Sequence, residues 1–201
     1  HTGPVTGLRY AADGQLLSGS SDGTLRRWTH DELSADGGLD TSTPVLAMQV
    51  LPDGRIVTAG EDGVIRSWTP ALDAEPQLEF RGHEGPVTSL AVGGVEQTIL
   101  VSGGRDGTVR VWDAATAEQT KLLEHGAPVE AVAVSGDGQR LASAGDNQVT
   151  LLWDAAGEQV AELKGDFRRQ LDVERAEHVV AVAKREIENA KSDLKEVNER
   201  K

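Results

Sequence analysis

The sequence contains no cysteine. This absence excludes disulfides, thiolate metal sites and the C-x-x-C-H motif that attaches haem. It is compatible with an extracytoplasmic setting, because a chain without thiols is insensitive to their oxidation, but it leaves the compartment unknown. Long apolar runs are absent too. No stretch approaches the ~18 residues that a membrane-spanning helix needs, so we expect no membrane insertion from this segment.

Basic residues are scarce over most of the chain. Residues 1–165 contain 24 Asp and Glu but only 11 Lys and Arg, whereas residues 166–201 contain 9 of each kind. The formal net charge of −13 therefore belongs to the first segment. Nucleic acid and anionic membrane surfaces are repelled by such a field, so we expect neither as a partner.

Two kinds of residue recur at a fixed interval. Tryptophan recurs after 40, 44 and 41 residues, at Trp28, Trp68, Trp112 and Trp153. Proline before an apolar run recurs after 40, 42 and 42 residues, at Pro4, Pro44, Pro86 and Pro128. A period of about 40–45 residues is that of one four-stranded propeller blade. The sequence therefore predicts four repeats, over about 1–40, 41–81, 82–124 and 125–165.

Each repeat contains the same order of strands and turns. The first strand is expected at 86–92 in the third repeat, and its apolar residues suggest burial on both faces. Its counterparts are 4–10, 44–50 and 128–134. Asp-Gly pairs follow the first and second strands in most repeats, and glycine supplies the positive φ of a tight hairpin turn. The third strand ends on the tryptophan, and a more polar fourth strand forms the exposed outer edge.

The third repeat carries a set of residues that resembles the WD40-repeat β-propeller family: Gly82-His83, Ser102, Asp106-Gly107 and Trp112-Asp113. In that family a His, a Ser or Thr, an Asp and the Trp of one blade form a buried hydrogen-bonded chain, here called a tetrad. The resemblance covers residues 1–165 and implies tetrads at His83, Ser102, Asp106 and Trp112 and at His1, Ser18, Asp22 and Trp28. A buried indole N–H needs an acceptor and a buried carboxylate needs donors, which agrees with such a chain.

Two repeats depart from this pattern. The second has Thr41 at the histidine position, which leaves Thr58, Asp62 and Trp68. The fourth keeps His125, Ser143 and Trp153 but has Asn147 at the aspartate position and Gln148 at the following glycine position. We therefore predict weaker tetrads in the second and fourth blades. The fold class is all-β, with four antiparallel four-stranded blades that form an incomplete propeller.

Catalytic and metal-binding interpretations are weak. A G-x-S-x-G match occurs at Gly19-Ser20-Ser21-Asp22-Gly23, but that motif requires a strand-to-helix elbow and this segment reads as a turn between strands. The histidines are scattered, and most aspartates sit in periodic turns rather than in calcium loops. They are His1, His30, His83, His125 and His178. We expect no catalytic residue, no metal site and no cofactor.

The variable positions within the repeats lie in the turns. The positions before the second-turn aspartate hold Ser21, Glu61, Arg105 and Asp146. The positions after the histidine hold Thr2, Ser42, Glu84 and Gly126. In the WD40 family these turns lie on one rim of the propeller, a common docking face. The resemblance implies candidate partner-binding residues at Ser21, Glu61, Glu84 and Arg105, and the alternative is that they are solvated loop tips.

Residues 166–201 contain no Gly or Pro, and Asp166 is a suitable N-cap. Apolar residues there step by 3 and 4 over four heptads, which is typical of a coiled coil. The seam consists of Val173, Ala176, Val180, Ala183, Ile187, Ala190, Leu194 and Val197. Alanine buries little area, so the seam alone is weak. At ~1.5 Å per residue the helix would be ~54 Å long, and we expect a partner helix in cis or in trans.

These features predict a non-catalytic scaffold for protein–protein interaction with a coiled-coil arm. Four blades are fewer than the family's usual number of about seven, and both ends of the chain fall inside patterns. We therefore expect a fragment of a larger protein, and the chain resembles part of a bacterial multidomain WD40 protein with a coiled-coil arm. Two alternatives stay open. One is the regulatory or sensory WD40 part of a larger bacterial enzyme or cytochrome c-type redox protein, which the residue usage and family analogy suggest. The other is a structural oligomeriser driven by the helix.

Overall fold

The computed structural model of the chain describes residues 1–28, 35–95 and 98–164. The chain divides into two units, His1–Leu163 and Lys164–Lys201, and the fold below is that of the first unit. The helix expected over 166–201, with its seam from Val173 to Val197, lies outside the described residues.

The described strands form four antiparallel sheets of four strands each, which confirms the all-β prediction. In chain order within the sheets they are β1 (Val5–Tyr10), β2 (Leu16–Ser20), β3 (Thr24–Trp28) and β4 (Ala35–Asp40); β5 (Val45–Val50), β6 (Ile56–Gly60), β7 (Ile65–Trp68) and β8 (Leu78–Phe80); β9 (Val87–Gly93), β10 (Ile99–Gly104), β11 (Thr108–Asp113) and β12 (Gln119–Glu124); β13 (Val129–Val134), β14 (Arg140–Gly145), β15 (Val149–Asp154) and β16 (Gln159–Lys164).

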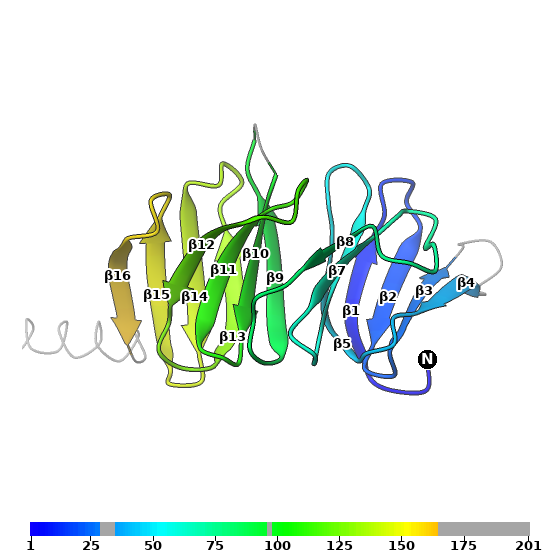
Figure 1. Cartoon of the computed structure of the whole chain (residues 1–201), viewed down its shortest axis with the longest axis horizontal. Coiled ribbons are helices and arrows are strands. Elements are labelled where there is room, and N and C mark those ends of the chain that lie inside the picture. Colours follow the sequence, from blue (N-terminus) through cyan, green and yellow to red (C-terminus); the bar gives the residue numbers. More distant parts are fainter. Residues whose placement is uncertain (29–34, 96–97, 165–201) are drawn as a thin grey trace, which may run out of the picture. The chain divides into compact units, whose positions relative to one another are not determined.

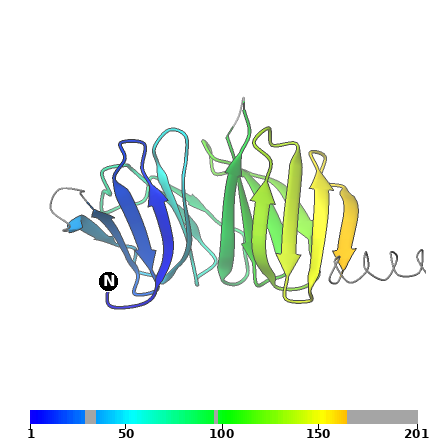
Figure 2. The ribbon, with the colours of Figure 1, turned by 180° about the vertical axis from the view of Figure 1, so that it is seen from behind.

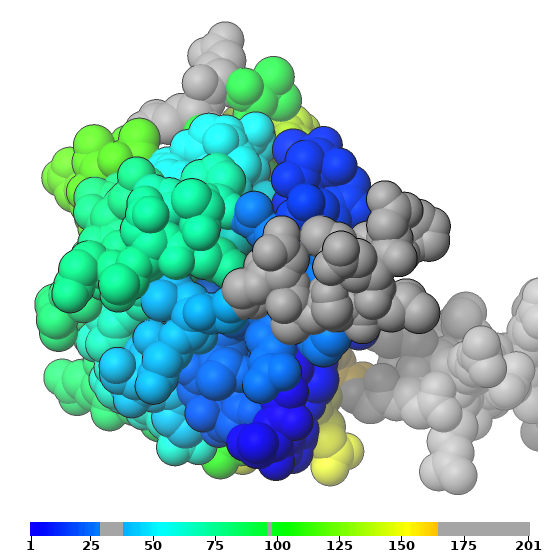
Figure 3. Space-filling view, turned by 90° about the vertical axis from the view of Figure 1, so that its right-hand side faces the viewer, coloured from blue at the N-terminus to red at the C-terminus, as the bar shows by residue number. Residues whose placement is uncertain are grey.

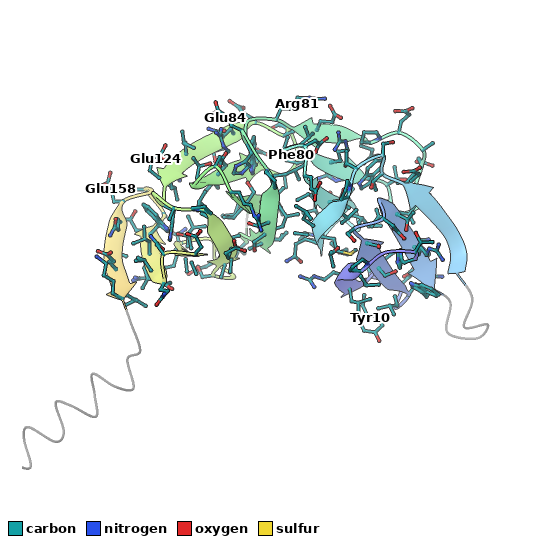
Figure 4. All side chains as sticks on the ribbon, turned by 90° about the horizontal axis from the view of Figure 1, so that it is seen from below. Tyr10, Phe80, Arg81, Glu84, Glu124 and Glu158 are labelled. Carbon is teal, nitrogen blue, oxygen red and sulfur yellow. The ribbon has the colours of Figure 1, made fainter. Side chains whose placement is uncertain are left out.

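Each sheet is one blade, in which sequential strands are joined by hairpins. The blades follow one another in chain order, and the first strand of each blade packs beside the first strand of the next (Figures 1 and 2). The first turns of the blades lie at the upper end in Figure 1, and the second turns lie at the lower end, near the N-terminus. Figure 4 views this lower end and shows the four first strands along one side of the row and the fourth strands along the other.

The hydrophobic core lies between successive blades. Three clusters of buried side chains occupy the three interfaces, and each contains the tryptophan of the later blade packed on the earlier one. At the middle interface the rings of Phe80 and Trp112 meet edge to face, with centroids 5.8 Å apart. This arrangement suits aromatic quadrupoles and buries both rings almost completely. The tryptophan at the end of each third strand therefore joins neighbouring blades.

The expectation that the first strands are buried on both faces is wrong. None of the four is buried throughout, half of the residues of β13 are exposed, and β1 departs furthest. Val45, Val87 and Val129 are at most 1% exposed, whereas Val5 at the same position of β1 is 50% exposed. Leu8 is likewise 54% exposed. The physical reason is that these positions pack against the preceding blade, and within the described ranges no blade precedes the first. Figure 3 views the unit from the side of this first blade, which is drawn in blue.

The second turn of each blade requires a left-handed residue. Gly23, Gly63 and Gly107 have φ values of 81°, 76° and 81° there, and Gln148 has a φ of 63° at the same position. Glycine adopts this conformation without steric cost, whereas a residue with a Cβ is strained by it. The alignment of Gln148 with the glycines therefore agrees with the backbone.

We expect Gln148→Gly to raise the free energy of unfolding by about 0.5–1 kcal/mol, because relief of the left-handed strain exceeds the extra chain entropy of glycine. Urea unfolding followed by tryptophan fluorescence measures the change. Gln139→Gly is the matched control: Gln139 is exposed and lacks a positive φ, so its replacement should leave stability unchanged or lower it. Equal effects of the two substitutions would contradict the strain argument.

Candidate functional site

The third blade contains a complete hydrogen-bonded chain from tryptophan to aspartate. Trp112 Nε1 donates to Ser102 Oγ at 2.9 Å, and Ser102 Oγ lies 2.8 Å from His83 Nε2. His83 Nδ1 lies 2.8 Å from Asp106 Oδ2. A carboxylate only accepts, so Nδ1 carries the proton of the neutral ring and Nε2 accepts from the serine hydroxyl. Each polar group of this tetrad therefore has a hydrogen-bond partner in the next residue of the chain of bonds.

Asp106 also holds the neighbouring loop and turn. It accepts hydrogen bonds from the backbone N–H of Glu84 and of Thr108, each at 3.0 Å. Burial alone would raise the pKa of Asp106, but the N–H groups of Glu84, His83 and Thr108 outweigh it and lower the pKa. Burial lowers the pKa of His83, although the adjacent Asp106 opposes this shift. The folded blade thus favours a neutral His83 beside an ionised Asp106.

The first blade assembles the same kinds of residue, but its histidine meets the threonine hydroxyl rather than the aspartate directly. Trp28 Nε1 donates to Ser18 Oγ at 2.8 Å, and His1 Nε2 lies 2.5 Å from the same oxygen. His1 Nδ1 lies 2.6 Å from Thr24 Oγ1, which donates to Asp22 Oδ1 at 2.6 Å, while His1 and Asp22 are 3.6 Å apart. The Thr24 hydroxyl therefore bridges His1 and Asp22. The same hydroxyl, together with further hydrogen bonds, lowers the pKa of Asp22 despite the opposing effect of burial.

In the second blade an arginine takes the place of the missing histidine. Trp68 Nε1 still donates to Thr58 Oγ1 at 2.8 Å. Asp62 instead receives Arg66 Nη2 at 2.7 Å. Burial would raise the pKa of Asp62, but the bond from Arg66 lowers it. The hydroxyl of Thr41 lies 2.7 Å from the carbonyl oxygen of Gly23, so it ties the loop to the first blade rather than to Thr58.

The fourth blade has only the tryptophan side of the chain. Trp153 Nε1 donates to Ser143 Oγ at 3.0 Å, and His125 Nδ1 lies 2.8 Å from the same oxygen. The other ring nitrogen of His125 is buried and has no hydrogen-bond partner among the described residues. Asn147 Oδ1 accepts from the backbone N–H of Val149 at 3.1 Å, as the aspartates do in the other turns. The lower strength expected of the second and fourth networks stays a prediction.

The rim residues stand at one end of the blades on anchored backbone. The N–H groups of Ser21, Arg105 and Asp146 donate to the carbonyl groups of Pro4, Pro86 and Pro128, at 2.9, 2.9 and 3.0 Å. The side chains of Glu61, Glu84 and Arg105 are exposed, and Ser21 is half-buried. In the part of the chain that the structure describes, these three charged residues make no ion pair. Glu84 is labelled at this end of the molecule in Figure 4.

The G-x-S-x-G match lies in the hairpin turn between β2 and β3, so it lacks the strand-to-helix elbow. Ser20 is fully buried, and its Oγ accepts from the backbone N–H of Asp22 at 3.1 Å. Over residues 1–28, 35–95 and 98–164, no three His, Cys, Asp or Glu side chains are grouped so that they could hold a metal ion. His30 and His178 lie outside these ranges. In the same ranges no helix is long and apolar enough to cross a membrane.

The repeats match the family model of the WD domain, G-beta repeat, at residues 1–29, 37–69, 74–113 and 117–154. These segments make up more than half of the chain, and the chain therefore belongs to the WD40-repeat family.

Known relatives share these repeats. The chain is 34% identical over 160 residues to periodic tryptophan protein 2 of Arabidopsis thaliana, covering 77% of this chain and 18% of that protein. It is 40% identical over 89 residues to a ribosome biogenesis protein BOP1 homolog of Oryza sativa, covering 43% of this chain and 13% of the relative. It is 48% identical over 56 residues to the small ribosomal subunit protein RACK1y of the same plant, covering 27% and 17%. These relatives are eukaryotic, so they give no support to the expected bacterial multidomain protein.

The third tetrad makes stability depend on pH. Burial lowers the folded pKa of His83 below its ordinary value of 6.5, so the unfolded chain binds more protons between the two values. We expect the free energy of unfolding to fall as the pH drops below 6.5 through the folded pKa. A further loss follows at lower pH, because the pKa of Asp106 lies below 3.8 and its stabilising contribution disappears as the pH falls through that lowered pKa.

Urea unfolding at pH 7.0 and 5.5 checks this expectation. The control is His83→Gln, which keeps hydrogen-bonding groups at the position but does not titrate. The variant should lose less stability than the parent between the two pH values. An equal loss in both proteins would assign the pH dependence to other groups.

Proposed function

We propose that the chain is a non-catalytic scaffold for protein–protein interaction, and that the rim around Ser21, Glu61, Glu84 and Arg105 docks a protein partner. The observation that carries the proposal is the contrast between backbone and side chains at the rim. Hydrogen bonds to proline carbonyls and to tetrad carboxylates hold its backbone, whereas the exposed side chains differ in charge from blade to blade. A rigid frame that presents varied side chains suits selective recognition, because little ordering entropy is lost on binding.

Family membership supports this role, since WD40 domains generally bind proteins. Two of the relatives are named for the ribosome or its biogenesis, and so for a macromolecular assembly. The chain spans only 13–18% of the length of the three relatives described above. Their names therefore suggest work within an assembly and do not identify the partner.

The rim proposal is tested by replacing three exposed charges. We expect the triple variant Glu61→Ala, Glu84→Ala and Arg105→Ala to weaken capture of a partner at least tenfold. A few residues carry most of the energy of an interface, and the loss of about 1.4 kcal/mol among the three is sufficient for this effect. The measurement is quantitative affinity capture with the parent chain as bait, followed by titration of the captured protein against each variant.

The matched control removes the same charges at the opposite end, with Glu118→Ala, Arg140→Ala and Glu158→Ala, all of which are exposed positions. This control should bind as the parent does. Unchanged partner binding by the rim variant would place the interface elsewhere, and equal losses in the two variants would show a general charge effect.

We further propose that residues 166–201 form a coiled-coil arm that joins a helix in cis or in trans. The support is the eight-residue seam from Val173 to Val197, whose steps of 3 and 4 residues match a heptad pattern. The division of the chain into blades over 1–165 and an arm over 166–201 belongs to the same proposal. A larger propeller is also consistent with the exposed face of β1, because Val5 and Leu8 occupy positions that a preceding blade covers elsewhere.

If the arm associates in trans, the full chain should sediment as a dimer or larger species. The double substitution Ile187→Asp and Leu194→Asp should return it to a monomer, because burying two unpaired charges in the seam costs several kcal/mol. Ser192→Asp together with Asn189→Asp, off the seam, is the charge-matched control. A full chain that sediments as a monomer at all accessible concentrations would exclude self-association and leave a partner helix in cis or in a different protein.

A further inference from the structure

A hollow of about 630 Å³ lies at the end of the blades opposite the rim. It is bordered by residues in the later parts of the first strands β1, β5, β9 and β13 and by Leu51 and Pro52, which follow β5. The rim is at the other end of these strands, where Ser21, Arg105 and Asp146 bond to the prolines that precede them. In Figure 1 the end with the hollow faces upward.

The shape of the hollow follows from one position in the repeat. Five residues after the proline anchor, the four blades hold Arg9, Gln49, Ala91 and Ala133, and all four line the hollow. The two alanines leave the space that longer side chains fill in the first two blades. The remaining lining is mostly Val and Leu, and it contains no Asp or Glu. Arg9 and Gln49, from blades one and two, therefore form a polar wall of the hollow. Val92, Val132, Ala133 and Val134, from blades three and four, form most of an apolar wall, together with Ser89.

The polar wall is held in place by a chain of hydrogen bonds across the first three blades. Arg9 Nε donates to Gln49 Oε1 at 2.9 Å, and Gln49 Nε2 donates to the carbonyl oxygen of Leu90 at 2.9 Å. Arg9 Nη1 donates to the carbonyl oxygen of Leu8 at 2.8 Å. A guanidinium has five N–H groups, so three of them make no hydrogen bond within the described residues.

The positive charge of Arg9 is also uncompensated locally. No carboxylate among the described residues forms an ion pair with it, and Asp53, in the first turn of the second blade, is already paired with Arg55 at 2.7 Å. The net negative charge of the whole unit acts through solvent, where screening limits it to roughly 8 Å at physiological ionic strength. At contact distance the nearby guanidinium of Arg9 outweighs the more distant negative charges, so the hollow favours an anionic ligand.

We propose that this hollow binds an acidic peptide segment, in which one Asp or Glu carboxylate pairs with Arg9 and flanking aliphatic residues contact the apolar wall at Val132, Ala133 and Val134. Guanidinium and carboxylate match in charge and in planar geometry, and the pre-oriented Arg9 loses little entropy on pairing. A small free acid would satisfy only the polar wall. The exposed lining is mainly polar, so the pair with Arg9 is the larger contribution. Contact of an aliphatic side chain with the apolar wall adds a smaller one, which favours a peptide over a free acid.

The test uses the full 201-residue chain and a capped pentapeptide with the sequence Val-Ala-Glu-Ala-Val. Titration followed by ¹⁵N–¹H NMR reports directly on Arg9, because its Nε–H signal is identified by its loss in Arg9→Lys. We expect saturable binding that shifts this signal. The Val-Ala-Gln-Ala-Val peptide should bind about tenfold more weakly, which corresponds to the loss of a charge-assisted pair.

Variants separate the two walls. Arg9→Gln should weaken binding of the Glu peptide about tenfold, and Arg9→Lys should weaken it less, since the ammonium keeps the charge but not the bidentate geometry. Ala133→Leu fills the apolar side without touching Arg9 and should also weaken binding. Ala133 is exposed, so this variant is expected to fold, and thermal unfolding checks both substitutions. Arg81→Gln, an equal charge change at an exposed arginine on the outer edge (Figure 4), should bind as the parent does.

Several outcomes would overturn the proposal. They are an absence of saturable binding, equal affinity for the Glu and Gln peptides, and undiminished binding by Arg9→Gln or by Ala133→Leu. Affinity for glutarate equal to that for the Glu peptide would show a free-acid site instead. The rim triple variant should bind the Glu peptide normally, so failure of this proposal is distinguishable from failure of the rim proposal.

Discussion

The bond from the tryptophan indole to a hydroxyl is the interaction on which the blades depend. It occurs in all four blades, at 2.8 Å to Ser18, 2.8 Å to Thr58, 2.9 Å to Ser102 and 3.0 Å to Ser143. It persists where the histidine is missing, in the second blade, and where the aspartate is missing, in the fourth. A buried indole N–H without an acceptor would be costly, and the bond also fixes the orientation of the ring. In the second, third and fourth blades that ring packs on the preceding blade, so one polar contact inside a blade sets the apolar contact between blades.

Much of the fold follows from periodic residues. The proline and tryptophan anchors locate the first and third strands, and Asp-Gly pairs locate the hairpins, because each of these residues acts through local backbone geometry. The repeat alignment places Gln148 at the position of three turn glycines, and its positive φ agrees with that placement. Burial was harder to predict. The sequence of β1 reads like that of β9, yet Val5 and Leu8 are exposed, because burial depends on a neighbouring blade rather than on the strand itself.

The residues of the tetrads also differ in how well the sequence predicts their contacts. His83, Ser102, Asp106 and Trp112 could be grouped from their places in the repeat, and the structure places them in hydrogen-bonding contact. The contacts that replace a missing or indirect tetrad contact could not be predicted from the repeat. Arg66 reaches Asp62 from the third strand, and Thr24 lies between His1 and Asp22. The link from Arg9 to Gln49 joins two blades across 40 residues of sequence, and no local pattern signals a contact of that kind.

The carboxylate of Asp106 serves the interior and the surface at once. One of its oxygens accepts from the buried ring of His83 and from the backbone N–H of the exposed Glu84. The path of the rim loop is therefore specified from within the blade, by a residue that a docking partner need not touch. Substitution at position 84 changes the chemical character of the surface while the peptide that carries it stays in place. In a repeat of this kind, single substitutions at the rim can change binding preference while the fold stays the same.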